Sequence, residues 1–158
     1  MSYILELRNA LKEEYRHMPI IQVGAAIVVA KGNEILLQRR TDNDKWGLPG
    51  GVQELKESVR TNAVRELYEE TNLITREEDL ILFEVFSGSS RYSKYPNGDE
   101  VYNNTTVFVV KEYTGELKCD EESKELKFFD VDNLPDGMFE DERIMFDTYI
   151  EKLKVGLI

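Results

Sequence analysis

The sequence holds a single cysteine, Cys119, and a single histidine, His17. One cysteine excludes an internal disulfide, and this composition fits a reducing, cytoplasmic setting better than an exported disulfide scaffold. One histidine gives little support to a zinc site built on histidines or to a Ser-His-Asp triad. We therefore expect any acid-base chemistry in this protein to fall to carboxylates.

Basic residues are also scarce, since 20 Lys and Arg stand against 31 Asp and Glu, for a formal net charge of -11. Binding to polymeric DNA or RNA requires cationic side chains that face phosphates, so neither polymer is an expected partner. A small anionic substrate remains compatible with this charge if a divalent cation bridges it to acidic side chains.

Long hydrophobic runs are missing too. No apolar run reaches the length of a membrane span, and the first 18 residues mix acidic and basic side chains among apolar ones, unlike a signal peptide. A chain of 158 residues with 41% hydrophobic and 10% aromatic residues favours one packed globular domain. We expect this domain to cover residues 1–158, with residues 1–18 as an N-terminal helical extension.

The spacing of apolar residues predicts the secondary structure. Apolar side chains at helical spacing predict one amphipathic helix from Tyr3 to Tyr15 that ends before Pro19. The run IIQVGAAIVVA predicts a strand buried on both faces, and the turn signal Gly32-Asn33 joins it to a second strand, EILLQRR. Further strands are predicted in LILFEVFSG, VYNNTTVFVVKEYTG and LKFFDVD, and helices from Ser58 to Thr71 and over about 141–153. Strands flanked by helices predict an α/β sandwich.

Three glutamates, Glu66, Glu69 and Glu70, lie close together on the predicted helix from Ser58 to Thr71. At about 100° of turn per residue, they project within an arc of about 100° on one helix face. Neighbouring carboxylates raise each other's pKa, so a bound divalent cation is the simplest physical reason for the arrangement. Oxygen-only ligands favour Mg²⁺ or Mn²⁺ over zinc. Taken alone, however, such a cluster is more often a solvated helix face.

The spacing around the three glutamates is more specific than the cluster itself. It consists of Gly51, five residues, Glu57, seven residues, Arg65-Glu66-Leu67, one residue, Glu69-Glu70, one residue and Asn72-Leu73. This pattern closely resembles the Nudix, or MutT-like, hydrolase box. It departs from the family at Asn72, where Gly is usual, but Asn also tolerates the left-handed conformation at a helix end. The resemblance spans residues 20–153.

The resemblance implies a mixed sheet sandwiched between helices and metal-dependent cleavage of nucleoside diphosphates linked to another moiety. It implies that Glu66, Glu70 and the Gly50 carbonyl are metal ligands, and that Glu69 is a ligand or the base that deprotonates water. Arg65 and Glu57 are implied to support these ligands through charge-assisted hydrogen bonds. The implied reaction is attack of an activated water on one phosphorus of a pyrophosphate bridge, with Mg²⁺ or Mn²⁺ as cofactor.

Outside the box, the segment CDEESKELKFF offers Glu121, Glu122 and Glu125. We expect Glu122 to supply a further metal ligand, the alternative being a solvated acidic loop. Arg39 and Arg40 end the second strand beside the glycine loop. Because successive strand residues point to opposite faces, only one of them can face the cleft and contact phosphate.

The segment from Ser87 to Glu100 is longer and more aromatic than a simple hairpin needs. We expect Tyr92, Tyr95 or Tyr102 to stack on a base or ribose, and Arg91 or Lys94 to meet phosphate. The alternative is a surface excursion whose tyrosines pack locally. Trp46 is expected to fill the core beside Leu48 rather than to stack on a ligand.

Substrate identity does not follow from the box, because variable loops select what is attached to the shared pyrophosphate. Candidates are ADP-ribose, nucleotide sugars, dinucleoside polyphosphates and nucleoside triphosphates. Two other functions stay open: a nucleotide-sensing module without turnover, and isomerisation of a prenyl diphosphate. The intact glutamate set disfavours the sensing module. The single cysteine and the lack of a second histidine-bearing metal site disfavour the isomerase. A homodimer would cover the first helix and the apolar edges.

Overall fold

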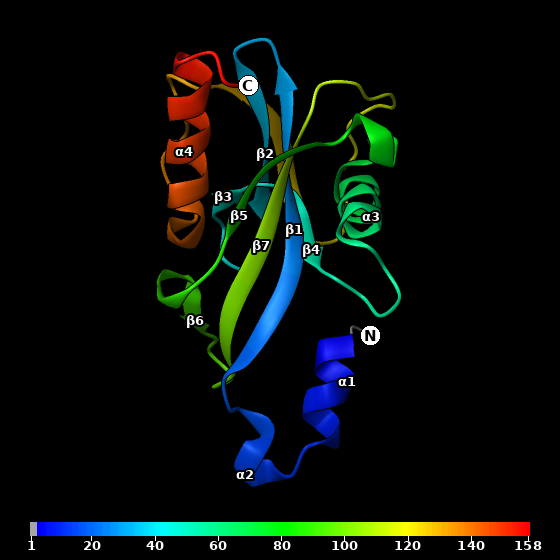
Figure 1. Ribbon diagram of the computed structural model, residues 1–158, viewed down its shortest axis with the longest axis vertical. Helices are drawn as coiled ribbons and strands as arrows, with labels where there is room; N and C mark the ends of the chain where they lie inside the picture. Colours follow the sequence, from blue (N-terminus) through cyan, green and yellow to red (C-terminus); the bar gives the residue numbers. More distant parts are fainter. Residues whose placement is uncertain (1–2) are drawn as a thin grey trace.

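The computed structural model describes residues 3–158, which form a mixed β-sheet held between helices (Figure 1). The helices are α1 (Tyr3–Ala10), α2 (Glu13–Arg16), α3 (Val59–Thr71) and α4 (Arg143–Lys154), with short 3₁₀ turns η1 (Glu77–Asp79), η2 (Ser89–Arg91) and η3 (Glu140–Glu142). The strands are β1 (Ile20–Lys31), β2 (Glu34–Arg40), β3 (Trp46–Gly47), β4 (Gly50–Val52), β5 (Ile81–Phe86), β6 (Tyr92–Lys94), β7 (Glu100–Val110) and β8 (Ser123–Asp130).

The sheet has the strand order β3-β2-β1-β7-β5, with β4 paired to β1, β6 to β7 and β8 to β2. β1 and β7 run parallel along ten residue pairs, from Ile20 opposite Val101 to Val29 opposite Val110, and the other pairs are antiparallel. A parallel pair needs a long crossover connection. Here the crossover contains α3, which brings this helix onto one face of the sheet.

Helices cover both faces of the sheet. Residues of β1 alternate between the two cores, with Ala25, Ile27 and Val29 in the core that contains Leu67 of α3. Ala26, Val28 and Ala30 lie in the other core, beside Phe146 of α4. Leu67 has no exposed surface, so truncation to alanine would cost about 2–5 kcal/mol. These layers confirm the predicted α/β/α sandwich with a mixed sheet flanked by helices.

Trp46 lies in the core, as predicted. Its indole is 7% exposed and packs edge-on against Phe129, with ring centroids 4.9 Å apart. Leu48 belongs to the same core cluster.

The prediction that β1 is buried on both faces is right for Ala25–Ala30 and wrong for Ile20–Gly24. Figure 1 shows that the first halves of β1 and β7 extend beyond α3 and α4. Ile21 is 70% exposed there and Val23 is 39% exposed. The residues on the same strand therefore differ in burial because the helices are shorter than the sheet. The predicted homodimer, which would cover such surface, stays a prediction.

The prediction of one helix from Tyr3 to Tyr15 is wrong, because the chain breaks between α1 and α2 at Leu11 and Lys12. The break allows the guanidinium of Arg8 to reach the carbonyls of Arg16 and Met18. In a continuous helix, Arg8 and Arg16 would lie about 12 Å apart along the axis. In place of a continuous helix, the chain therefore folds back so that the carbonyls of Arg16 and Met18 lie against Arg8.

The segment between β5 and β7 is ordered by η2 and by β6, which pairs with the start of β7. Along residues 3–158, no helix has the length and apolar character needed to cross a membrane.

Candidate active site

Helix α3 carries the three neighbouring glutamates, and its two ends form as the sequence predicts. Ser58 caps the first turn by accepting a hydrogen bond from Thr61 N at 3.0 Å. Asn72 adopts the left-handed conformation with φ 62°, and its side-chain amide donates to Glu116 O at 2.9 Å. That bond is one a glycine could not make. The departure of Asn72 from the family pattern therefore preserves the helix end and adds an anchor to it.

Arg65 lies among three of the carboxylates. Its Nε and Nη2 form a two-point contact with Glu57, at 2.6 and 3.0 Å. Its Nη1 donates to Glu66 Oε1 at 2.8 Å and to Glu69 Oε2 at 2.9 Å, and Nη2 also donates to Val52 O. All five N–H donors of the guanidinium thus have partners. The hydrogen bonds of Arg65 hold the pKa of Glu57 below its ordinary value.

The glycine loop brings backbone close to the carboxylates of α3. A Cβ atom at Gly51 would lie 2.5 Å from Glu66 Oε1, so a side chain at this position would displace the carboxylate. Gly50, with φ 153°, donates its N–H to Glu70 Oε2 at 2.7 Å. Both glycines belong to β4, opposite Ala25 and Ala26 of β1. The sheet therefore fixes the loop against Glu66 and Glu70.

Burial makes Glu70 unlike the other two glutamates. It is 4% exposed, and loss of hydration raises its pKa to about 8, although the N–H of Gly50 opposes the shift. Burial also raises the pKa of Glu66, against the opposing charge of Arg65. The Glu69 side chain, in contrast, is 54% exposed. The cluster therefore holds two carboxylates that are costly to ionise and one that faces solvent.

Arg40, at the end of β2, and Glu122, in the turn before β8, lie near the same carboxylates. Burial lowers the pKa of Arg40, but its two-point contact with Asp42 and the charges of Glu70 and Glu122 outweigh this and leave the pKa raised. Arg39 points elsewhere and donates to Asp44 Oδ2 at 2.9 Å. The structure thus brings Arg40 and Glu122 to the cluster and leaves Arg39 outside it.

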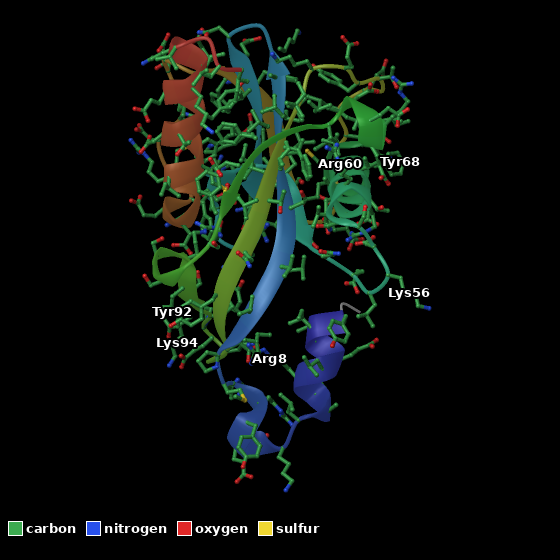
Figure 2. The ribbon with its side chains drawn as sticks, in the orientation of Figure 1. Arg8, Lys56, Arg60, Tyr68, Tyr92 and Lys94 are labelled. Atoms are coloured by element: carbon green, nitrogen blue, oxygen red, sulfur yellow. The ribbon has the colours of Figure 1, made fainter. Side chains whose placement is uncertain are left out.

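The tyrosines of the segment between β5 and β7 contact one another. Tyr92 packs on Tyr102 with ring centroids 5.3 Å apart, and its hydroxyl donates to Glu100 Oε2 at 2.9 Å. Lys94 also pairs with Glu100. Figure 2 shows Tyr92 and Lys94 toward the end of the sheet where Arg8 lies. Tyr95 is 41% exposed. The roles predicted for these side chains in substrate binding stay predictions.

Arg91, also expected near phosphate, is 7% exposed and donates through Nη1 to the carbonyl of Asp141. This places Arg91 in the packing between η2 and η3.

Two residues near the cluster were not predicted. Gln38 is 1% exposed on β2 and donates to Ser123 Oγ at 2.7 Å. The feature of the sequence that could have pointed to Gln38 is a polar residue inside an otherwise apolar strand. Glu142, just before α4, accepts a hydrogen bond from Leu48 N at 2.8 Å. Glu142 stands in an acidic stretch of sequence, so nothing distinguished it from solvated neighbours.

Within the described part of the chain, no three side chains of Asp, Glu, His or Cys converge tightly enough to hold a metal ion by themselves. Arg65 Nη1 lies between Glu66 and Glu69 and donates to both. The donors are carboxylate oxygens with more negative charge than the guanidinium balances, which fits a hard divalent cation.

The NUDIX domain family model matches residues 19–149 of this chain. The chain belongs to the Nudix family. It is a Nudix hydrolase of the pyrophosphatase type, as the box predicted, and α1 and α2 precede the matched residues. Nudix hydrolases in general depend on a divalent metal ion, and this dependence does not by itself distinguish Mg²⁺ from Mn²⁺.

A curated relative, the ADP-ribose pyrophosphatase of Methanocaldococcus jannaschii, is 35% identical over 91% of this chain and 81% of its own length. Among solved structures, the MutT Nudix hydrolase of Burkholderia pseudomallei has a TM-score of 0.70 and 25% identity, covering 82% of this chain and 98% of that one. A bifunctional NMN adenylyltransferase/ADP-ribose pyrophosphatase from Francisella tularensis, solved with AMP and a manganese ion, shares the fold. Its TM-score is 0.68 at 23% identity, covering 95% of this chain and 46% of that one.

Proposed function

We propose that this Nudix protein is a divalent-metal-dependent pyrophosphohydrolase that cleaves a nucleoside diphosphate linked to another moiety, with ADP-ribose as the first substrate to test. The observation that carries the proposal is the surplus of carboxylates around Arg65, with Glu70 buried beside them. The choice of ADP-ribose rests on the archaeal relative, whose name states that activity for that protein.

Glu66, Glu70, Glu122 and the Gly50 carbonyl are the groups that would hold the cation, as Mg²⁺ or Mn²⁺. When bound, such a cation lowers the pKa of water and neutralises phosphoryl oxygens. Arg65 and Glu57 orient Glu66 through the contacts described above. Loss of hydration raises the pKa of Glu66 and Glu70, so an added positive charge would relieve the cost of ionising both.

Glu69 is the residue we assign as the base that accepts the proton of the attacking water. Its side chain is 54% exposed, against 12% for Glu66, so it has the freest access to a substrate and to water. In the proposed step, the water oxygen forms a bond to one phosphorus and its proton passes to Glu69. The bridging P–O bond then breaks, which releases a phosphomonoester.

Arg40 is the cationic residue we assign to phosphate, because it lies beside the carboxylates whereas Arg39 is paired with Asp44. Tyr92 and Tyr95 are assigned to the base or ribose. Tyr92 stands beside Tyr102 in the pairing of β6 with β7, and this pairing puts it on the sheet face that carries α3.

A substrate panel tests the proposal. ADP-ribose, a nucleotide sugar, a dinucleoside polyphosphate and a nucleoside triphosphate are each incubated with the protein and Mg²⁺ or Mn²⁺, and released phosphomonoesters are measured. Running the reaction in ¹⁸O-labelled water and locating the label in one phosphate product identifies attack at phosphorus. Turnover of at least one compound is expected, with loss of turnover in EDTA. Binding of these compounds without any release would instead support the sensing module.

A further inference from the structure

Gln38 is an almost fully buried polar side chain in a strand that is otherwise apolar at its centre. It is 1% exposed, and Leu36 and Leu37, which precede it on β2, have no exposed surface. Burial of a carboxamide is unfavourable unless its polar atoms find hydrogen-bond partners. Because side chains alternate along a strand, Gln38 shares its sheet face with Arg40, which lies beside the glutamate cluster. The partners of Gln38 therefore show what the buried amide does.

The partner of the Gln38 amide is Ser123, at the start of β8. Gln38 Nε2 lies 2.7 Å from Ser123 Oγ, and Ser123 Oγ lies 2.8 Å from Asp120 Oδ1. A carboxylate only accepts hydrogen bonds, so the single hydroxyl proton of Ser123 goes to Asp120. Ser123 must then accept from Gln38, which assigns the nitrogen of the amide to this side. The bonding pattern thus fixes the orientation of the Gln38 amide.

Glu70 lies next to the same serine. Ser123 Oγ lies 3.4 Å from the backbone carbonyl of Glu70. Through its amide nitrogen and Ser123, Gln38 therefore connects to the residue that carries the buried carboxylate. The amide oxygen, by contrast, has no hydrogen-bond partner.

The chain segment held by Ser123 is the one that carries Glu122. Glu122 N donates to Asp120 Oδ1 at 3.0 Å, and Glu122 O accepts from Thr41 N, just after β2. Gln38 therefore holds Ser123 at the point where two parts of the candidate metal site, from distant stretches of sequence, meet. One is Glu70 on α3, and the other is the turn at residues 120–123.

We propose that Gln38 is a positioning residue that, through Ser123, holds the turn at residues 120–123 beside Glu70 and so sets the separation between Glu70 and Glu122. The proposal rests on the proposed function, in which both glutamates hold the same cation. Without Gln38, Ser123 loses its side-chain donor, and the turn is held less firmly beside Glu70. The cation site would then have to be ordered by the cation itself, which weakens binding.

The test compares Gln38→Leu, which removes the amide at similar size, with wild type and with Thr75→Val. Thr75 is a matched control, because it is 7% exposed and its hydroxyl donates to Glu112 O, so the variant also loses one buried hydrogen bond. Mn²⁺ binding is measured without substrate, from the electron paramagnetic resonance signal of the free ion. The expected result for Gln38→Leu is a Kd raised tenfold or more, with the Thr75→Val value unchanged.

Turnover provides the second measurement. In Gln38→Leu, the Mg²⁺ concentration for half-maximal rate should rise by the same factor, while kcat at saturating Mg²⁺ should fall less. Ser123→Ala removes the middle of the link without touching either glutamate, and should change Mn²⁺ affinity in the same direction by a smaller factor. It also serves as the test if Gln38→Leu fails to fold. Wild-type Mn²⁺ affinity in a folded Gln38→Leu, or in Ser123→Ala where that is the test, would overturn the proposal. Wild-type protein that neither binds Mn²⁺ nor turns over any substrate would overturn the proposed function itself.

Discussion

Arg8 near the end of α1 and Arg65 on α3 both make several hydrogen bonds, but the charges around the two arginines differ. Arg8 is 3% exposed and donates to three backbone carbonyls, of Arg16, Met18 and Glu100, with Asp99 as its carboxylate partner at 3.5 Å. Arg65 instead contacts the carboxylates of three glutamates. One carboxylate balances the positive charge of Arg8, whereas the three carboxylates around Arg65 carry more negative charge than its guanidinium balances.

The difference separates a structural ion pair from a site that needs a further ligand. Around Arg8, hydrogen bonds from His17 and Asn97 and the charge of Arg8 outweigh burial and lower the pKa of Asp99. The Arg8 cluster is therefore satisfied within the chain. Around Arg65, loss of hydration raises the pKa of Glu66 and Glu70. An added positive charge would favour the ionised forms of Glu66 and Glu70. Three carboxylates around one guanidinium, together with the burial of Glu70, mark the candidate active site.

The largest effect is expected from neutralising the surplus charge. Glu69→Gln and Glu70→Gln should each leave the fold intact and lower turnover at least a thousandfold, which corresponds to about 4 kcal/mol of transition-state stabilisation. The reason is loss of the base in the first variant and of a cation ligand in the second. Turnover on the best substrate of the panel is measured with Mg²⁺, and folding is checked by circular dichroism.

Glu78→Gln is the matched control for both variants, because Glu78 lies on η1 and only approaches Arg76, at 3.4 Å. It should retain wild-type turnover. If Glu69→Gln and Glu70→Gln both keep wild-type turnover as well, the assignment of the α3 carboxylates is wrong.

At the Arg8 cluster, we expect a loss of local stability with little change in turnover. Arg8→Met leaves three carbonyls without their donor and removes the cationic partner of Asp99, and breaking such a buried pair costs about 3 kcal/mol or more. The cost should fall on the attachment of α1 and α2 rather than on the sheet. Hydrogen exchange of the amides in residues 3–18 and 95–100 should accelerate by about a hundredfold, while kcat changes little.

Arg16→Met offers a comparison on the same segment, because Arg16 pairs only with the exposed Glu13. Exchange there should stay near wild type. A loss of kcat in Arg8→Met as large as in Glu70→Gln would mean that the two clusters do not differ as their charges indicate.

The sequence predicts the carboxylate cluster around Arg65 far better than the contacts around Arg8. Glu66, Glu69 and Glu70 fall on one face of one helix, so local periodicity is enough to bring them together, and Ser58 and Asn72 mark where the helix begins and ends. The β1-β2 hairpin follows from Gly32-Asn33 for the same local reason. Features that depend on residues close together in the chain could therefore be predicted from the sequence.

Features that depend on distant partners were not. Arg8 contacts residues eight to 92 positions away, and the break between α1 and α2 follows from those contacts rather than from helix propensity. Glu142 reaches Leu48 across 94 positions, and Gln38 reaches Ser123 across 85. No periodicity connects such pairs, so only the folded sheet brings them together. The two clusters thus differ in how they arise as well as in charge.

The smallest expected effect is a pH dependence that distinguishes the two kinds of carboxylate. Loss of hydration raises the pKa of Glu142 to about 7, although the N–H of Leu48 and the charges of Arg40 and Arg91 oppose this and Asp141 adds to it. Between about pH 4.5 and 7 the folded chain holds a proton that the unfolded chain has released. The free energy of unfolding should therefore fall as pH rises through this window, by up to about 1.4 kcal/mol per pH unit from this group.

Glu142→Gln removes that contribution, so its free energy of unfolding in urea should fall less steeply between pH 5 and 7 than that of wild type. Asp99 gives the opposite sign, because its pKa is lowered in the fold: its stabilisation is present above its ordinary pKa and is lost as pH falls below it. Asp99→Asn should therefore flatten the acid limb of the curve and leave the slope above pH 5 unchanged. Equal slopes above pH 5 in wild type and Glu142→Gln would show that the Glu142 carboxyl ionises as readily in the fold as in water. The contrast between carboxylates whose pKa is lowered by the fold and those whose pKa is raised would then be limited to α3.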